Sequence, residues 1–510
     1  MLLHEWLEQH ARNTPEKVAL VCESERISFG EIDTRARALA ATLQACGVQR
    51  GDRVAIYLEN CTEAVVSIFA ALKAGAVFMP VNPQTKADKL TYLLNDSEAR
   101  ALITSGVLSN IAGTAVEKAA SIAASVIVQP TSAEPVGGRK TQSYEAAMQA
   151  SHPYSTPPSI DQDLASIIYT SGSTGEPKGV MVTHLNMTSA ATSISTYLGL
   201  RNDDVIINVL PIAFDYGLYQ ILMASRVGAT VVLQRSLAFP TRVLETMVRE
   251  RVTVLPGVPT VFSMLLNLER LSSYELSTLR MVTNTAAALS ETQIRDIRRA
   301  FPQATLFSMY GLTECKRVTY LPPEQLDIRP MSVGRGMPNE EVWLVDESGK
   351  RLPNGHVGEL VVRGSNVMRG YWRKPRETAE RLKPGEIPGE MYLYTGDIFR
   401  TDSEGWLYFV GRKDDIIKSR GEKVSPREVE NILYRLDGVL EAAVVGVSDP
   451  LLGQAVKAFV VLKQGFIYSE RDVIKHCLSH LESFMAPARV VFLDALPRTD
   501  TGKISKRGLD

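Results

Sequence analysis

One segment of the chain, residues 169–180, constrains its fold and function more than any other. An apolar run typical of a strand, residues 165–169, leads into a loop of glycines, hydroxyl side chains and one lysine, Tyr169-Thr-Ser-Gly-Ser-Thr-Gly-Glu-Pro-Lys-Gly-Val180. A helical pattern begins at Thr183. Glycines let backbone N–H groups turn toward one centre, and the hydroxyls and Lys178 add donors and positive charge. The segment therefore predicts a phosphate-binding loop.

This loop is not a Walker A motif. Pro177 precedes the lysine where that motif has glycine, and Gly179 follows it where the motif has serine or threonine. A segment of this composition can also be a turn without a ligand. The phosphate assignment therefore depends on the rest of the chain.

Strand and helix patterns alternate along the first hundred residues. Helical periodicity is found at 32–47 and 62–74, and strand patterns at 18–21, 52–58 and 76–81. Such alternation is typical of a parallel or mixed sheet whose faces are covered by helices. Further strands are expected at residues 124–128, 204–209, 230–233, 252–254 and 305–308.

The pattern changes twice toward the C-terminus. Residues 341–411 contain short strands and glycine turns, which indicate a β-rich subdomain, and residues 426–481 fit a compact α+β unit. A chain of 510 residues also exceeds a single core. We therefore expect an α/β fold with a large N-terminal domain, residues 1–411, of parallel or mixed sheets with helices plus the β-rich subdomain. A small, mobile α+β C-terminal domain, residues 412–510, follows it.

Composition excludes several classes of function. The formal net charge of −1 and the lack of basic tracts give no electrostatic footprint for nucleic acid. Five scattered cysteines without a C-x-x-C pair fit a reducing compartment and give no zinc signature. Neither a secretory signal nor an apolar run long enough to span a bilayer is visible. We expect a cytoplasmic protein with no nucleic-acid partner and no membrane span.

Four further polar segments follow the loop, each of which alone would be an ordinary turn, loop or tail. They are Tyr310-Gly-Leu-Thr-Glu314, Tyr394-Thr-Gly-Asp397, Gly411-Arg-Lys-Asp-Asp-Ile-Ile-Lys-Ser-Arg-Gly-Glu-Lys423 and Pro497-Arg-Thr-Asp-Thr-Gly-Lys-Ile-Ser-Lys506. Together with the first loop, these segments occur in an order and at separations by which the chain resembles the adenylate-forming (ANL) superfamily. That superfamily contains acyl- and aryl-CoA ligases, amino-acid adenylation enzymes of peptide synthesis, and luciferases. The resemblance covers essentially all 510 residues.

The resemblance implies an AMP-forming acid–thiol ligase that uses ATP and Mg²⁺ in two half-reactions. A carboxylate attacks the α-phosphate of ATP and releases pyrophosphate. The thiol of CoA or of a phosphopantetheinylated carrier protein then attacks the acyl-adenylate and releases AMP. Two anions meet in the first step, so positive charge is needed there. Lys503 matches the catalytic lysine that bridges the carboxylate and the phosphate.

The resemblance also implies the nucleotide contacts. Glu314 is the expected catalytic and magnesium-binding acid, Tyr310 stacks on adenine, and Thr313 touches the α-phosphate. Asp397 would accept hydrogen bonds from the ribose hydroxyls, with Arg412 binding the same ribose. The loop residues expected to hold the β- and γ-phosphates are Thr170, Ser171, Gly172, Ser173, Thr174, Gly175 and Lys178.

The resemblance further implies that the small domain rotates between the half-reactions. Asp414 matches the hinge of the family. Lys418 and Gly421 lie on the loop expected to face the active site in the second state, with Lys418 as a catalytic residue. Gly421 would line the thiol tunnel, which a side chain would obstruct.

The acid that is activated is left open by the sequence. Asp215 of the Phe214-Asp215 pair stands where amino-acid-activating members bind the substrate ammonium, and it could equally cap the following helix, residues 219–227. The segment is similar to that of enzymes that load proline onto a carrier protein, whereas Thr285-Ala-Ala-Ala288 is closer to the acyl-CoA ligase form. The expected substrate residues are Asp215, Tyr216, Tyr219, Asn284 and Thr285, with Met309 and Cys315 beside them. Ordinary helix packing is the alternative for Tyr219.

Two other functions remain open. An amine could capture the adenylate and give an amide, or the chain could be a catalytically inactive, nucleotide-binding relative. An inactive relative is expected to lose the catalytic lysine or the acid on magnesium, and this chain keeps Lys503, Glu314, Asp397 and Arg412.

Overall fold

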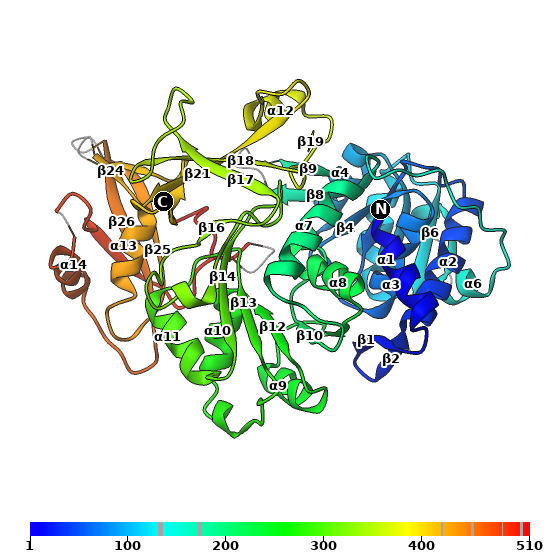
Figure 1. Ribbon diagram of the computed structural model, residues 1–510, viewed down its shortest axis with the longest axis horizontal. Coiled ribbons are helices and arrows are strands. Elements are labelled where there is room, and N and C mark those ends of the chain that lie inside the picture. Colours follow the sequence, from blue (N-terminus) through cyan, green and yellow to red (C-terminus); the bar gives the residue numbers. More distant parts are fainter. Residues whose placement is uncertain are drawn as a thin grey trace.

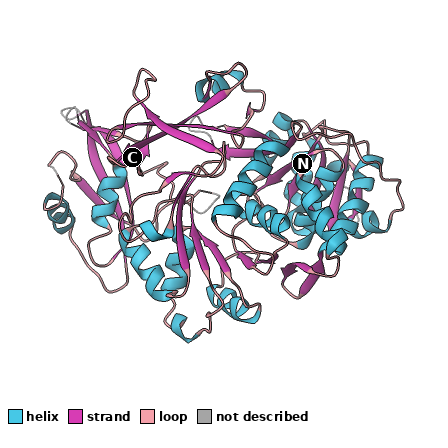
Figure 2. Cartoon of the chain, in the orientation of Figure 1, coloured by secondary structure: helices cyan, strands magenta, loops and turns pink. Residues whose placement is uncertain are grey.

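The structure is a computed structural model that describes residues 1–130, 136–171, 176–419, 422–449, 453–481, 483–499 and 503–509. Two large sheets with helices form the N-terminal part, and smaller sheets lie toward the C-terminus (Figures 1 and 2). The α/β fold class expected from the sequence is confirmed. Among the described helices, none has both the length and the apolar character of a membrane span.

One large sheet has nine described strands and a parallel centre. All neighbours from β14 to β1 are parallel, whereas β15, β16 and β2 run antiparallel to their neighbours. Its order is β16 (Arg335–Gly336), β15 (Thr319–Leu321), β14 (Thr305–Tyr310), β13 (Met281–Asn284), β12 (Val254–Gly257), β10 (Val205–Asn208), β11 (Thr230–Leu233), β1 (Val18–Cys22) and β2 (Glu25–Ser28).

The second large sheet has eight described strands and ends in an antiparallel hairpin. Strands from β8 to β7 are parallel, and β9 and β19 are antiparallel additions. Its order is β19 (Gly370–Tyr371), β9 (Pro177–Thr183), β8 (Leu164–Ser171), β4 (Val77–Val81), β3 (Arg53–Tyr57), β5 (Ala99–Ser105), β6 (Ala124–Val128) and β7 (Lys140–Ser143).

Strand β9 corrects one expectation from the sequence, because residues 177–180 belong to a strand rather than to the phosphate loop. Val180 and Val182 alternate toward the core, and β9 pairs with β8 from Ser171↔Pro177 to Leu164↔Thr183. The two described ends of the predicted loop segment, residues 169–171 and 177–180, thus belong to the paired strands β8 and β9, and β9 separates the segment from the following helix.

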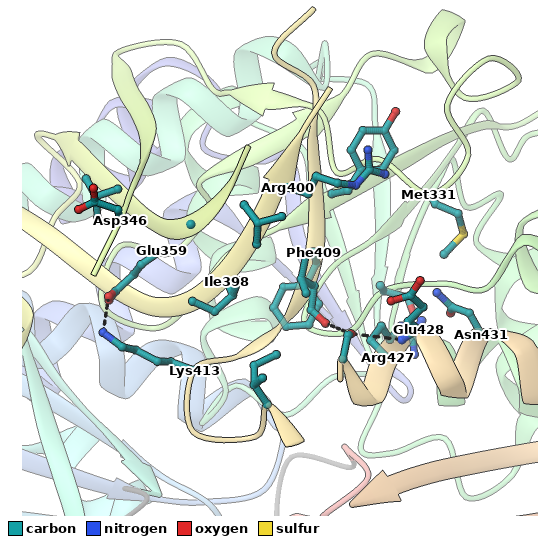
Figure 3. A pocket seen from close by; sticks show the side chains of 18 of the residues that line it. Met331, Asp346, Glu359, Ile398, Arg400, Phe409, Lys413, Arg427, Glu428 and Asn431 are labelled. Atoms are coloured by element: carbon teal, nitrogen blue, oxygen red, sulfur yellow. Dashed lines mark hydrogen bonds and ion pairs between the residues drawn. The ribbon is translucent and has the colours of Figure 1, made fainter. Parts of the chain in front are cut away.

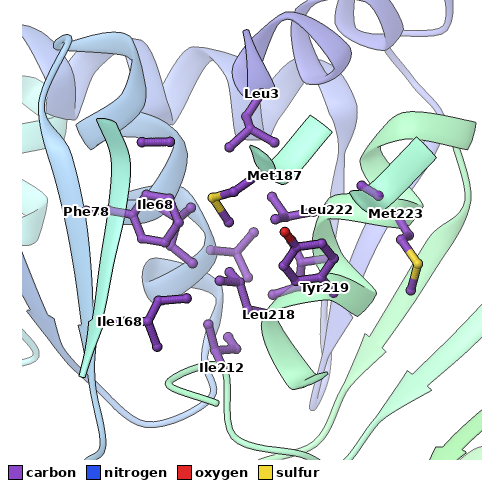
Figure 4. Packing of buried hydrophobic residues seen from close by; sticks show 14 of the residues in the cluster. Leu3, Ile68, Phe78, Ile168, Met187, Ile212, Leu218, Tyr219, Leu222 and Met223 are labelled. Carbon is purple, nitrogen blue, oxygen red and sulfur yellow. The ribbon is translucent and has the colours of Figure 1, made fainter. Parts of the chain in front are cut away.

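Helices form three layers around the two large sheets. The central layer is shared by both sheets, as seen where Ile68, Phe78, Met187 and Leu218 meet in one buried cluster (Figure 4). The central helices are α1 (Leu3–Asn13), α2 (Phe29–Ala45), α3 (Thr62–Lys73), α6 (Tyr144–Gln149), α7 (His184–Tyr197) and α8 (Asp215–Val227). The outer helices are α4 (Ala87–Ser97) and α5 (Ser109–Glu117) on the eight-stranded sheet, and α9 (Pro240–Arg249), α10 (Pro259–Leu266) and α11 (Glu291–Ala300) on the nine-stranded sheet.

Side chains of the parallel strands alternate between these layers. In β3, Val54 packs into the central helix layer, and Ala55 packs against the outer helices of the eight-stranded sheet. In β11, Val231 faces the central layer, and Val232 faces the outer helices of the nine-stranded sheet. Both faces of each sheet are therefore covered, which explains why the strands read as nearly continuous apolar runs.

Two smaller sheets complete the fold. The β-rich sheet contains β17 (Glu340–Val345), β18 (Val357–Gly364), β20 (Leu382–Pro384), β21 (Met391–Thr401) and β22 (Leu407–Arg412), with α12 (Pro375–Arg381) beside it. The C-terminal sheet contains β23 (Ile417–Ser419), β24 (Glu422–Val424), β25 (Val439–Asp449), β26 (Gly453–Leu462) and β27 (Arg489–Phe492), with α13 (Pro426–Leu433) and α14 (Glu470–Leu478). Strand β27 was not expected from the sequence. The boundary between residues 411 and 412 stays a prediction.

Candidate active site

The expected nucleotide residues Tyr310, Asp397 and Arg412 meet where the nine-stranded sheet approaches the β-rich sheet. Asp397 and Arg412 lie opposite each other in the β21–β22 pair. The Tyr310 hydroxyl donates to Asp397 Oδ2 at 2.5 Å, and Arg412 Nε donates to Asp397 Oδ1 at 3.2 Å. The ring of Tyr310 also packs edge-to-face on Phe399, with 4.8 Å between ring centroids. The carboxylate of Asp397 is therefore fixed before any ligand binds.

Burial controls the charges of this group. Only 4% of the Asp397 surface is exposed, and this burial raises the pKa of its carboxyl, while Arg412 and the Tyr310 hydroxyl act in the opposite direction. The nearby Asp397 carboxylate in turn raises the pKa of Arg412. Arg412 thus remains a cation at any physiological pH.

Glu314 and Lys178 converge on Tyr371, a residue that the sequence analysis did not select. The Tyr371 hydroxyl donates to Glu314 Oε1 at 2.7 Å, and Lys178 Nζ lies 5.5 Å from the centre of the Tyr371 ring. Strand β19, which carries Tyr371, pairs with β9, which carries Lys178. This short strand therefore joins the hairpin of the predicted phosphate loop to the acid of the Tyr310–Glu314 turn.

The backbone of that turn is close-packed at its glycine. A Cβ atom on Gly311 would lie 2.0 Å from the carbonyl oxygen of Lys316, so no other residue fits without a backbone shift. Thr313 accepts a hydrogen bond from Lys316 Nζ at 2.9 Å through its own carbonyl oxygen. The turn is therefore held from both of its ends.

Glu314 is suited to a magnesium ion that a substrate shares. Among the described residues, no group of three or more His, Cys, Asp or Glu side chains could hold a metal by itself. Mg²⁺ commonly binds through one or two carboxylates plus substrate phosphates. The single partly buried carboxylate of Glu314, beside the phosphate-loop hairpin, fits that mode.

Lys503 reaches this site from the C-terminal tail. Its Nζ lies 5.3 Å from the centre of the Phe214 ring. Burial lowers the pKa of Lys503, and the neighbouring carboxylate of Asp215 is the main influence that raises it. On the same pKa, Arg412 acts to lower it and Asp397 to raise it.

Asp215 is not a helix cap. Helix α8 begins at Asp215, its N-cap residue is Phe214, and no side-chain cap hydrogen bond is present there. Asp215 is buried, and it raises the pKa values of both Lys503 and Lys316, which burial alone would lower. The capping alternative is therefore wrong, because no side-chain cap is present at this end of α8.

The other expected substrate residues surround Asp215 but do not offer equal chemistry. The Tyr216 hydroxyl is already bound to the Thr283 carbonyl at 2.8 Å. By contrast, buried polar atoms without a partner among the described residues belong to Tyr219 (Oη), Asn284 (Oδ1) and Thr285 (Oγ1). Tyr219 packs in the core shown in Figure 4, with its hydroxyl unpartnered among the described residues, and its place in the substrate pocket stays a prediction.

Met309 and Cys315 are buried at the two ends of the Tyr310–Glu314 turn. Tyr197 of α7 donates to Met309 Sδ at 2.9 Å and stacks on Tyr320 with 4.0 Å between ring centroids. Burial raises the pKa of the Cys315 thiol, which keeps the thiol neutral. These residues form an aromatic and apolar wall.

Sequence reasoning also missed Lys316 and Arg317. Both are charged side chains with 3% or less of their surface exposed. The guanidinium carbon of Arg317 lies 4.4 Å from the centre of the Tyr216 ring. The only signal was two consecutive cations directly after the Tyr310–Glu314 turn, a pattern that usually marks an exposed loop.

Several expected residues cannot be compared with the structure in full. Gly172, Ser173, Thr174, Gly175 and Gly421 lie outside the described residues. For Ser171 and Lys418, only their places in β8 and β23 are described. Thr170 lies in β8, where its hydroxyl is 3.5 Å from the carbonyl oxygen of Lys178, and Asp414 is exposed in the turn after β22.

A cavity of about 770 Å³ lies apart from these residues, between the β-rich sheet and α13 (Figure 3). We refer to it as the junction cavity. Its lining includes Ile398, Phe409, Lys413 and Arg427, and Lys413 Nζ is 2.9 Å from Glu359 Oε2. It adjoins the turn that carries Asp414, because Lys413 and Ile416 both line it.

Comparisons with known proteins agree along the whole chain. A family model described as AMP-binding enzyme matches residues 7–372, and one described as AMP-binding enzyme C-terminal domain matches residues 428–503. A long-chain-fatty-acid–CoA ligase of Bacillus subtilis (strain 168) is 32% identical over 531 residues, covering 99% of this chain and 93% of the relative. A feruloyl-CoA synthase of Amycolatopsis sp is 32% identical over 509 residues, covering 99% of this chain and 97% of the relative.

Solved structures give the same picture. The anthranilate CoA ligase AuaEII in complex with anthranoyl-AMP matches with a TM-score of 0.90 and 28% identity, over 100% of this chain and 96% of that chain. The amide bond synthetase McbA from Marinactinospora thermotolerans matches with a TM-score of 0.88 and 27% identity, over 100% and 99%.

Proposed function

Because the chain belongs to the family of AMP-binding enzymes, we propose that it activates a carboxylic or amino acid as its acyl-adenylate, at the expense of ATP, and transfers it to a thiol. The observation that carries this proposal is the hydrogen-bonded group of Tyr310, Asp397 and Arg412, together with the placement of Lys503, from the distant C-terminal tail, against the Phe214 ring. Such a group supplies both nucleotide-binding and charge-neutralising side chains.

The nucleotide is proposed to bind over β21 and β22. Asp397 accepts the ribose hydroxyls, Arg412 binds the same ribose, and Tyr310 stacks on adenine. The existing bond from Tyr310 to Asp397 supports this assignment, since it holds the carboxylate in place. Thr313 contacts the α-phosphate, while Lys178 and residues 170–175 hold the β- and γ-phosphates.

Magnesium is proposed to bind through Glu314 and the phosphates. The ion would neutralise phosphate charge during displacement of pyrophosphate. Tyr371 orients the Glu314 carboxylate through its hydrogen bond at 2.7 Å.

Lys503 is proposed to neutralise the two anions that must meet when the adenylate forms. Its ammonium group lies next to the Phe214 ring, on the side of the expected acid pocket. The charges of Asp215, Asp397 and Arg412 all influence its pKa. A cation between the two substrates stabilises the transition state more than either separated ground state.

The second half-reaction is proposed to use another orientation of residues 412–510. Rotation at Asp414 would withdraw Lys503 and bring Lys418 and Gly421 toward the adenylate. CoA or the pantetheine arm of a carrier protein then attacks the acyl carbon. Similarity alone does not identify this acceptor, because the chain matches a CoA ligase and an amide bond synthetase about equally well.

The proposal is tested by acid-dependent exchange of labelled pyrophosphate into ATP, over a panel of amino, aryl and fatty acids. Exchange with at least one acid is expected. Adding CoA, a pantetheinylated carrier protein or an amine in competition then identifies the acceptor. Binding of ATP without exchange for any acid would instead indicate a catalytically inactive relative.

Asp215 is proposed to bind an ammonium group of the substrate. For Asp215→Asn, we expect kcat/KM in the exchange assay to fall about 100-fold more for norvaline than for valerate, which lacks the ammonium group. Since Asp215 raises the pKa of Lys503, the loss of its charge should lower that pKa. The alkaline limb of the pH–rate profile should therefore move to lower pH for both acids.

The ratio between the two acids separates these effects, because any change in Lys503 is common to both. An unchanged ratio would remove Asp215 from the ammonium role. An unchanged alkaline limb would show that Asp215 does not control the charge of Lys503.

A further inference from the structure

Arg317 has an unused hydrogen-bonding edge in the interior of the protein. The residue is 3% exposed, and its Nε and Nη2 atoms have no partner among the described residues. No described carboxylate lies within 4 Å of its guanidinium group, and Nη1 makes only a contact of 3.5 Å with the Lys316 carbonyl. Buried polar groups in folded proteins are almost always satisfied by protein, water or ligand.

The unpaired atoms are the two that hold carboxylates elsewhere in this chain. Arg50 binds Asp163 through Nε at 2.9 Å and Nη2 at 2.5 Å, and Arg280 binds Asp204 through the same atoms at 2.8 and 2.5 Å. In this side-on geometry, two parallel N–H groups match the two oxygens of one carboxylate. Arg317 thus presents a complete carboxylate-binding fork without a carboxylate.

The position of Arg317 identifies what could supply that carboxylate. Its guanidinium lies over the Tyr216 ring, and its charge influences Tyr219, Tyr197 and Lys503. All of these residues belong to the expected acid pocket or its aromatic wall.

We propose that Arg317 determines substrate specificity by binding a second carboxylate of the acid, so that the enzyme activates dicarboxylic acids. This inference rests on the proposed function and adds the class of its substrate. One carboxylate reacts beside Lys503, and the other is held by Nε and Nη2 of Arg317. The stacked Tyr216 ring, whose hydroxyl is anchored to Thr283, keeps the guanidinium plane in place.

The test uses pairs of acids that differ only in the second carboxylate. Valerate is compared with glutarate and norvaline with glutamate, and the C3, C4 and C6 homologues are included to find the length that spans the two ends of the pocket. The readout is kcat/KM for pyrophosphate exchange. The diacid of the preferred length is expected to exceed its monoacid by about 100-fold or more, since a site built for a polar group rejects analogues that lack it.

Variants then assign that preference to Arg317. Arg317→Gln is expected to abolish the preference for diacids, measured as the ratio of kcat/KM for each diacid to kcat/KM for its monoacid. Arg317→Lys should retain part of it, because an ammonium group keeps the charge but lacks the fork. Arg335→Gln is the matched control and should leave kcat/KM for all of these acids unchanged. Like Arg317, Arg335 lies over an aromatic ring, 4.0 Å from the centre of Trp406. Unlike Arg317, it is exposed and donates a hydrogen bond to the Glu404 carbonyl.

The outcomes separate this inference from the proposed function. If the wild-type protein supports exchange with acids of any class but never prefers the diacid, the inference is wrong and the proposed function stands. Equal loss of all acids in Arg317→Gln would also overturn the inference, because Arg317 would then hold the reacting carboxylate or the fold. If no acid supports exchange, the proposed function itself fails.

Discussion

Replacement of Lys503 by alanine is expected to lower the rate of adenylate formation by about 100-fold or more. The ammonium group lies 5.3 Å from the centre of the Phe214 ring, beside the expected acid pocket, and we propose that it neutralises the two anions that meet there. Transfer of a presynthesised adenylate to thiol should continue at close to the wild-type rate, because that step uses another orientation of the tail. Pyrophosphate exchange measures the first step, and AMP release from the added adenylate measures the second.

A matched control is Arg507→Ala, which removes an exposed cation from the same tail. It should leave both steps within about twofold of the wild type. Equal losses in both steps for Lys503→Ala would contradict the two-orientation mechanism, because Lys503 would then be needed after the adenylate has formed.

The second large effect concerns stability and lies far from the site. Replacement of Lys73 by methionine is expected to lower the free energy of unfolding by about 3 kcal/mol. The Lys73 side chain is fully buried and pairs with Glu8 and Asp33, the latter at 2.7 Å. Methionine keeps most of the apolar stem but removes the buried cation that lies between the two carboxylates. Urea denaturation, followed by fluorescence, measures the loss.

Arg37→Met provides the control, since Arg37 pairs with the same Asp33 at 3.2 Å but is 52% exposed. Exposed pairs of this kind contribute about 0.5 kcal/mol or less. Similar losses in the two variants would show that burial of Lys73 does not determine the energy of this pair. Because the chain is long, coincident transitions by two probes must be established first.

The sequence predicted the parallel framework well because its strands are covered on both faces. Apolar runs such as residues 230–233 coincide with a strand, here β11, and the change of pattern after residue 341 coincides with the β-rich sheet. The misassigned element was β9, whose first residues are Pro177, Lys178 and Gly179, which are typical of a loop. Pairing with β8 and β19 overrides that local preference.

The candidate site was predictable where polar residues end or follow strands in fixed motifs. The grouping of Tyr310, Asp397 and Arg412 was implied by the resemblance to the adenylate-forming superfamily, because each motif alone would be an ordinary turn or loop. The unpaired edge of Arg317 could not be predicted, because the sequence does not distinguish a buried guanidinium from an exposed one. Only the packing of Tyr216 over it distinguishes the two cases.

The junction cavity has a consequence for the speed of the catalytic cycle. The β-rich sheet and α13, which form its two walls, make few dispersion contacts across the cavity, so few such contacts are lost when they separate further. Helix α13 lines this cavity, and its Arg427 Nη2 donates a hydrogen bond to the Ala288 carbonyl, beside the nine-stranded sheet, at 2.6 Å. After the helix, Arg435 forms an ion pair with Glu291 of α11 at 3.8 Å. In the two-orientation mechanism proposed above, a hollow seam of this kind would favour rapid movement of residues 412–510, and bulky side chains that fill it are expected to slow turnover while leaving affinity for both substrates intact.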